Sequence, residues 1–143
     1  MKRKQTSFVG ERPVFTGSPH IVEGGFNLDV ANQSYNVGDT IPAGTLAIYD
    51  EQTRQVKLIK TAKVSAIKAD DAKVVTLVTN PYSTPIFAVG DKVLKSISGA
   101  IADAPAITKI DNTDSGYIIT LSAAITGLAV GDTIQQVIAS GTN

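Results

Sequence analysis

Cysteine and tryptophan are absent from this sequence, and histidine and methionine occur once each. Without cysteine the chain has no disulfides and no thiolate metal ligands. A histidine-based hydrolase or metal site would need partners held around His20. The surrounding segment is too rich in glycine and proline to hold them. We therefore expect no catalytic residues and no metal site built on these residue types.

Long hydrophobic runs and net charge are also lacking. No stretch approaches the ~20 apolar residues of a membrane span. Residues 5–27 do not supply the roughly 7–15 apolar residues of a signal peptide. We therefore expect a protein that is made in the cytoplasm without a signal peptide and that does not enter a membrane. The formal net charge of +0 at pH 7 removes any overall attraction to nucleic acid.

The charges that are present are unevenly distributed. Residues 1–12 hold four basic residues and one acidic residue, whereas residues 99–143 hold four acidic residues and one basic residue. This asymmetry suggests oriented contacts between copies or with a partner. So few charges are equally well explained as ordinary solvated surface.

Residues 1–27 are expected to form an extended arm, followed by a β domain over residues 28–143. Glycine and proline recur in the arm too often for a helix, and proline limits strand pairing. The arm nevertheless carries Phe8, Phe15 and Phe26. A segment of this kind makes no core of its own but gains order on a partner's surface.

Strands separated by turns are expected from residue 37 onward. Segments rich in β-branched residues, which favour a pleated and half-buried surface, occupy residues 45–49, 55–59, 63–67, 73–79, 107–110 and 117–121. The first two flank a turn-forming run and predict a hairpin. No window has a convincing helical period, and Pro105 ends the nearest candidate, residues 100–106. The predicted fold is all-β, a small barrel or sandwich of short strands.

The triplet Val-Gly-Asp occurs three times, at residues 37–39, 89–91 and 130–132. The last two copies lie within longer segments of the same pattern, residues 64–93 and 107–134: a strand, an acidic turn, a second strand ending in Thr-Leu, a loop, Ala-Val-Gly-Asp and a further strand. This similarity suggests two duplicated β units, residues 64–99 and 105–141. Coincidence among common β-protein turn sequences explains it equally well.

Two functions are conceivable for the triplets. The simpler is structural: glycine takes a positive φ, and the aspartate accepts a bond from the turn that starts the next strand. The residues concerned are Gly38, Asp39, Gly90, Asp91, Gly131 and Asp132. The alternative is that the aspartates bind calcium or act as a carboxylate pair. We favour turns, and we expect no metal and no cofactor.

Two further patterns partly resemble binding sites. Residues 111–116 begin like a calcium-binding loop but lack its acidic third, fifth and twelfth ligands, so a hairpin turn is expected there. The densest basic stretch, Lys57, Lys60, Lys63, Lys68 and Lys73, has no interleaved aromatic residues or arginines to grip phosphates. We interpret it as a solvated face that protects edge strands from aggregation, and we expect no enzyme activity.

The segment Gly-Asp-Thr-Ile-Pro-Ala-Gly-Thr-Leu-Ala-Ile-Tyr-Asp at residues 38–50, with Lys-Leu-Ile-Lys-Thr-Ala-Lys at residues 57–63, resembles the head fiber and capsid decoration proteins of tailed bacteriophages. The resemblance covers residues 36–65. It implies a homotrimer made in the bacterial cytoplasm and carried on the outer surface of a phage or prophage capsid. The arm, with Phe8, Arg12, Phe15 and Phe26, would then attach the β domain to the major capsid protein.

The alternative function is a soluble carbohydrate-binding or adhesion module, with a host-surface glycan as its partner. Sugar sites usually expose aromatic side chains, and the chain offers only four tyrosines for this. In a trimer, two duplicated units per chain would place six similar modules around the axis, which suits a hexameric capsomer. The scarcity of charge in residues 99–143 favours that half as the contact between copies.

Overall fold

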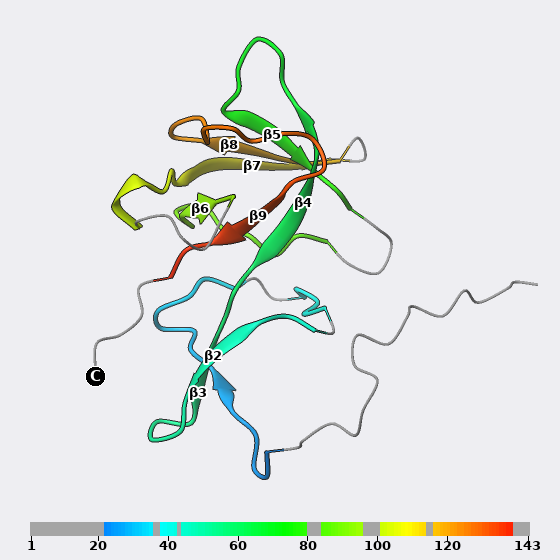
Figure 1. Cartoon of the computed structure of the whole chain (residues 1–143). Coiled ribbons are helices and arrows are strands. Elements are labelled where there is room, and N and C mark those ends of the chain that lie inside the picture. Colours follow the sequence, from blue (N-terminus) through cyan, green and yellow to red (C-terminus); the bar gives the residue numbers. More distant parts are fainter. Residues whose placement is uncertain are drawn as a thin grey trace, which may run out of the picture.

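The computed structural model describes residues 22–35, 38–42, 44–79, 84–95, 101–113 and 116–138. These residues form an all-β fold, as predicted, with two separate sheets (Figure 1). The elements in chain order are β1 (Asn27–Leu28), β2 (Ala47–Asp50), β3 (Gln55–Leu58), β4 (Thr61–Ile67), β5 (Val74–Leu77), β6 (Val93–Leu94), the short 3₁₀ helix η1 (Ile101–Asp103), β7 (Ile107–Thr113), β8 (Gly116–Leu121) and β9 (Thr133–Gln136).

The N-terminal sheet has the strand order β1-β3-β2 and is called the small sheet below. β2 and β3 form the predicted hairpin, with Tyr49 opposite Val56. The Asp50 carboxylate accepts the Gln52 N–H at 2.8 Å, and Arg54 takes a positive φ of 55° to close the turn. β1, which was not predicted, adds in parallel to the other side of β3.

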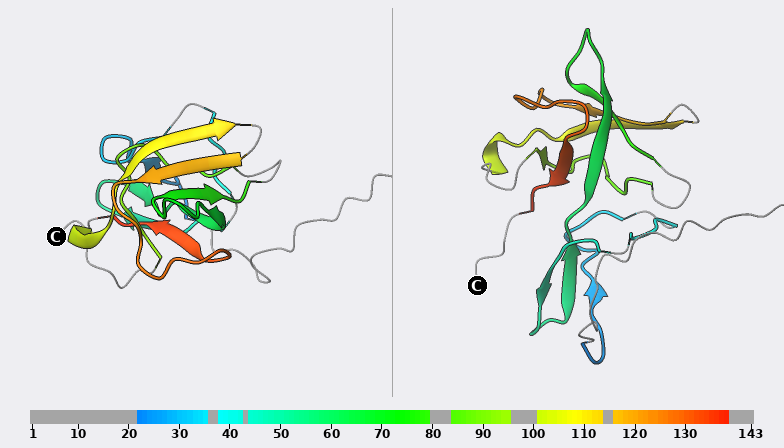
Figure 2. Two further views of the ribbon diagram at one scale, coloured as in Figure 1. Left: turned by 90° about the horizontal axis from the view of Figure 1, so that it is seen from above. Right: turned by 45° about the vertical axis from the view of Figure 1, so that its right-hand side comes forward.

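The six-stranded sheet has the order β6-β9-β4-β5-β8-β7, and each of its pairs is antiparallel. Its two outer strands meet through a bridge between Lys92 and Ala106. The Val93 N–H also donates to the Pro105 carbonyl oxygen at 3.0 Å. The sheet therefore curls into a small barrel, which Figure 2 shows from above.

The core lies inside the barrel because its strands alternate apolar inward and mixed outward residues. β8 has the pattern most clearly, with Tyr117, Ile119 and Leu121 buried and the residues between them half-buried. The other buried members of the core are Val64, Val75, Leu77, Phe87, Val93, Ile107 and Ile134. The Tyr117 hydroxyl donates to the Phe87 carbonyl oxygen at 3.1 Å, and burial raises the Tyr117 pKa to about 12.

The two sheets are joined by one nearly continuous run of extended chain. Only Ile59 and Lys60 separate the end of β3 from the start of β4, so this run leaves the small sheet and enters the barrel (Figures 1 and 2). Every second residue of it faces inward, from Leu58 through Lys60 to Val64. The small sheet therefore stands beside the barrel on a short, well-defined connection.

The two halves of the barrel follow one plan. Each has a hairpin, β4–β5 or β7–β8, then a Gly-Asp turn and a short strand, β6 or β9. The turn of each half bonds to the first strand of the other half: Gly90 N–H to the Ile107 oxygen at 2.8 Å, and Gly131 N–H to the Val64 oxygen at 2.9 Å. This equivalence fits the proposed units 64–99 and 105–141. Their origin by duplication stays a prediction.

The predicted boundary between the arm and the β domain lies within ordered chain. Residues 22–27 are part of the folded structure, because the Asn27 N–H bonds to the Arg54 oxygen at 2.9 Å and the Glu23 oxygen accepts a bond from the Arg54 guanidinium at 2.6 Å. Residues 1–21, and with them Phe8, Arg12, Phe15 and His20, lie outside the described residues.

Candidate interaction surface

The second and third Val-Gly-Asp triplets form the same turn. Gly90 and Gly131 have φ values of 96° and 93°. The aspartate carboxylate in each accepts the N–H of the alanine three residues earlier, at 2.8 Å for Asp91 and 2.7 Å for Asp132. Gly38 of the first triplet also has a positive φ, 95°, but Asp39 is not followed by a strand. The glycine and aspartate thus build turns in both barrel halves.

Each of the two barrel aspartates also binds a side chain from the other half. The ammonium of Lys95, the residue after β6, lies 2.8 Å from the Asp132 carboxylate, and Gln136, the last residue of β9, donates to Asp91 at 2.9 Å. Each donor lies shortly after the aspartate of its own half. Bonds from the Lys95 ammonium and the Ala129 N–H lower the pKa of Asp132 below its ordinary value.

The structure corrects the interpretation of Lys60 as part of a solvated lysine face. Its side chain is fully buried, and its ammonium lies 2.9 Å from the Asp91 carboxylate and 2.5 Å from the Ser34 carbonyl oxygen. The other lysines of that run, Lys57, Lys63, Lys68 and Lys73, are exposed or half-buried. The burial of Lys60 was missed because its anion is remote in sequence. The inward alternation of residues 58 to 64 was the signal that could have revealed it.

Around Lys60 a polar junction connects the small sheet to the barrel. The Gln33 amide accepts the Leu58 N–H at 2.8 Å and donates to the Leu58 oxygen at 2.5 Å, as a neighbouring strand would do. The same amide donates to Gln136 of β9 at 2.8 Å and accepts a bond from the Tyr35 hydroxyl. Among the described residues no buried side-chain N or O atom lacks a partner. The junction is thus fully satisfied and holds the two sheets together.

The small sheet exposes apolar residues that the barrel does not cover. All four residues of β2 are exposed. Leu46, Ile48 and Tyr49 are 57%, 43% and 58% exposed. Because side chains alternate along a strand, Leu46 and Ile48 lie on one face and Tyr49 on the other. No charged residue occurs between Asp39 and Asp50. We call residues 46–49 the exposed strand. It is the clearest candidate interaction surface in the described chain.

Phe26, the one predicted attachment residue in the described chain, lies against this surface. Its ring is tilted against that of Tyr49, with centroids 5.2 Å apart. The Arg54 guanidinium lies 4.8 Å from the centroid of the Phe26 ring. The end of the predicted arm therefore leads directly to the exposed strand.

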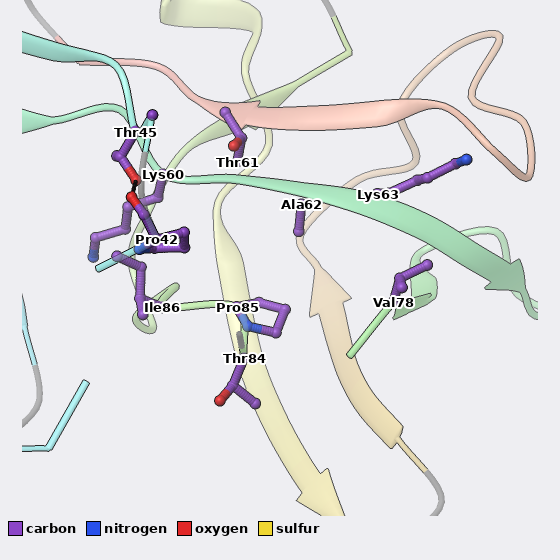
Figure 3. Close-up of a pocket in the computed structure, with 11 residues that line it drawn as sticks. Pro42, Thr45, Lys60, Thr61, Ala62, Lys63, Val78, Thr84, Pro85 and Ile86 are labelled. Atoms are coloured by element: carbon purple, nitrogen blue, oxygen red, sulfur yellow. Dashed lines mark hydrogen bonds between the residues drawn. The ribbon is translucent and has the colours of Figure 1, made fainter. Parts of the chain in front are cut away.

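A pocket of about 280 Å³ lies beside the start of the exposed strand (Figure 3). It is lined by the segment before β2, by Lys60 and the first residues of β4, by the residue after β5 and by the chain leading to Phe87. The residues are Pro42, Gly44, Thr45, Lys60, Thr61, Ala62, Lys63, Val78, Thr84, Pro85 and Ile86. The Thr45 hydroxyl donates to the Pro42 oxygen at 2.7 Å and fixes the bend before β2. Residues 38–50 and 57–63 therefore meet at this pocket.

The described residues hold no group of three or more histidine or acidic side chains that could bind a metal ion. Asp111, which begins the loop that resembles a calcium site, lies in β7 and pairs with Lys109 at 2.7 Å. In the same part of the chain no helix is long and apolar enough to cross a membrane.

Comparison with known proteins found no matching family model, no similar curated protein and no similar solved structure.

Proposed function

We propose that this chain is a structural virion protein that decorates the outer surface of a phage or prophage capsid, or projects from it as a fiber. The observation that carries the proposal is the division into two parts. A barrel with its own core stands beside a small sheet that exposes apolar, uncharged chain. Such a division suits a protein that attaches and assembles through one part and presents the other.

In this proposal the arm attaches the protein to the major capsid protein. Near the end of the arm, the Phe26 ring packs against that of Tyr49. The described residues of the arm, 22–27, therefore lie against the small sheet rather than against the barrel. Residues 1–12 also carry the excess of basic residues, which can pair with acidic side chains on a shell. The resemblance of residues 36–65 to head fiber and decoration proteins supports the same function.

The test begins with the genes on either side of this one, where the proposal expects a major capsid protein, and it uses empty shells of that protein. The full chain should sediment with the shells, and a chain without residues 1–21 should stay in the supernatant. The truncated chain retains the residues that contact Arg54, so its melting temperature should be close to that of the full chain. Failure of the full chain to sediment with shells overturns the proposal.

A carbohydrate-binding module is the second candidate, and one observation favours it. Tyr49 and Phe26 form an aromatic pair of which Tyr49 is largely exposed, and sugars stack on such surfaces. Binding to a glycan array that is lost in Tyr49→Ala would support this function. A fiber protein could carry out both functions, so the shell test and the array test are independent.

A further inference from the structure

We propose that the exposed strand is the contact between copies of this chain, and that it inserts between two neighbours around a three-fold axis. This inference rests on the proposed function for the trimer and adds where its interface lies. Four properties of the small sheet and barrel bear on it: exposure on both faces, an open edge, absence of charge, and the lack of an equivalent surface on the barrel.

Exposure on both faces distinguishes β2 from an ordinary edge strand. Ile48 stands opposite Lys57 on one face, and Tyr49 stands opposite Val56 on the other. A flat partner surface, such as a capsid shell, would cover one face and leave the other in water. A cyclic assembly gives each strand two different neighbours and so covers both faces.

The outer edge of β2 adds a second requirement. β2 is the last strand of the small sheet, so its outward backbone N–H and C=O groups have no strand partner in the described residues. Edge strands exposed to water usually carry charges that prevent pairing with other chains. The exposed strand carries none until Asp50. A strand that neighbouring copies cover in the assembled protein needs no such protection.

The absence of charge also selects the partner. The exposed strand itself carries no charge, and the Lys57 ammonium opposite Ile48 is paired with the Asp29 carboxylate at 3.6 Å, so identical chains can meet there with little like-charge repulsion. Binding to a charged partner would leave that partner's charges buried and unpaired against the exposed strand. The excess of basic residues lies instead in the arm, at residues 1–12, which the proposed function assigns to the capsid.

The strands of the barrel offer no comparable surface, because the large apolar side chains exposed among its described residues, Val78, Val89 and Val130, all lie outside strands β4 to β9. The scarcity of charge in residues 99–143 predicted an interface there. In the described part of that half, however, Val130 is the one large apolar side chain that is exposed. Its other large apolar residues face the core or are half-buried, because β7, β8 and β9 close the barrel. The interface between copies is therefore assigned to the small sheet.

The absence of cysteine makes a direct test available. Single variants Ala47→Cys and Ile48→Cys report on the two faces of the exposed strand, and Val130→Cys reports on the barrel surface. In the assembled protein at micromolar concentration, both strand variants should react with a maleimide at least about tenfold more slowly than Val130→Cys. Equal rates at all three positions overturn the inference. Protection on one face alone overturns the insertion between two neighbours.

Variants that introduce a lysine test whether the exposed strand is the interface, because they change the mass of the assembly in solution. Light scattering should give a trimer for the natural chain and for Val130→Lys, and a monomer for Ile48→Lys. A natural chain that is monomeric, or an Ile48→Lys chain that stays trimeric, overturns the inference. If Ile48→Lys fails to fold, which its melting curve would show, the cysteine rates decide the question.

Two controls distinguish a contact between copies from coverage by the arm and from attachment to a shell. If Ile48→Cys loses its protection in a chain without residues 1–21, while the oligomeric state is unchanged, the chain's own arm covers the strand and the inference is wrong. Sedimentation with shells tests the proposed function separately. If the protein is a trimer whose strand cysteines are protected on both faces, but it does not sediment with shells, the capsid function is refuted and the interface between copies stands.

Discussion

The Val-Gly-Asp turns at residues 89–91 and 130–132 have the same backbone geometry but different surroundings. Their glycine φ values differ by only a few degrees, and each aspartate accepts the N–H of the alanine three residues before it, Ala88 or Ala129. The pair Lys60–Asp91 has side chains 0% and 9% exposed, however, whereas the pair Lys95–Asp132 is 43% and 25% exposed.

The difference follows from what covers each turn. The small sheet lies over the Asp91 side of the barrel, where the polar junction brings Lys60 to Asp91 and joins Gln33 to Gln136. The cation paired with Asp132 is instead Lys95, which follows β6 and belongs to the barrel. The triplet therefore specifies the turn, whereas the energetic importance of its aspartate depends on the chain packed against it.

The largest effect is expected from Asp91→Asn. The asparagine oxygen can still accept the Ala88 N–H, but the buried Lys60 ammonium loses its counter-ion. We expect the free energy of unfolding to fall by about 3 kcal/mol. Urea unfolding measures this change, with Asp132→Asn as the matched control in the solvent-facing turn. A similar loss in both variants would mean that burial does not distinguish the two turns.

A double variant should recover part of that loss. Lys60→Met removes the charge that Asp91→Asn leaves buried and unpaired, so the two substitutions together should cost less than their sum. We expect a coupling energy of roughly 2 kcal/mol from the four unfolding curves of the cycle. Additive losses would show that Lys60 and Asp91 stabilise the protein through other contacts, such as the bond from Lys60 to the Ser34 oxygen.

Glycine substitutions should affect the two turns equally. An added Cβ at Gly90 or Gly131 meets no atom within 4 Å, so Gly90→Ala and Gly131→Ala test backbone strain alone. Each should lower the free energy of unfolding by about 1 kcal/mol because alanine disfavours positive φ. A markedly larger loss in Gly90→Ala would show that the small sheet constrains the first turn as well as covering it.

Much of the fold was predictable because its determinants are local. β-branched alternation marks β3, β4, β5 and β8, and the turn-forming residues 50–53 mark the hairpin. η1 falls within residues 100–106, the segment whose sequence comes nearest to a helical pattern. β1 was missed because two residues show no periodicity, and its position depends on β3, which lies far along the chain.

The candidate surface was less predictable because exposure depends on tertiary packing. Residues 45–49 look like any half-buried strand, and only the structure shows that β2 has no second layer of described residues over it. Lys60 shows the opposite error, because its sequence suggests exposure and its side chain is buried. A lysine in a run of lysines is expected on the surface, and only the structure places Asp91 beside it. Side-chain partners separated by tens of residues leave no local pattern to interpret.

The smallest expected effect is the pH dependence contributed by Asp132. The Lys95 bond lowers the pKa of this carboxyl in the folded state. Its stabilisation is therefore present above the unfolded pKa of about 3.9 and is lost as the pH falls through the folded pKa. Asp29 and Asp50 have lowered pKa values too, through bonds from Asn32 and from the Gln52 N–H. The natural chain should therefore lose stability in acid with or without Asp132.

The contribution of Asp132 is isolated by measuring melting temperatures of the natural chain and Asp132→Asn in parallel from neutral pH into acid. The difference between them should be small at neutral pH, should vanish once the natural carboxyl is protonated, and should shrink in 1 M salt, where the Debye length is about 3 Å. A difference that persists in acid would come from the amide itself rather than from the lost charge. A difference insensitive to salt would mean that the Lys95 pair is shielded from solvent, and the contrast between the two turns would then be one of degree.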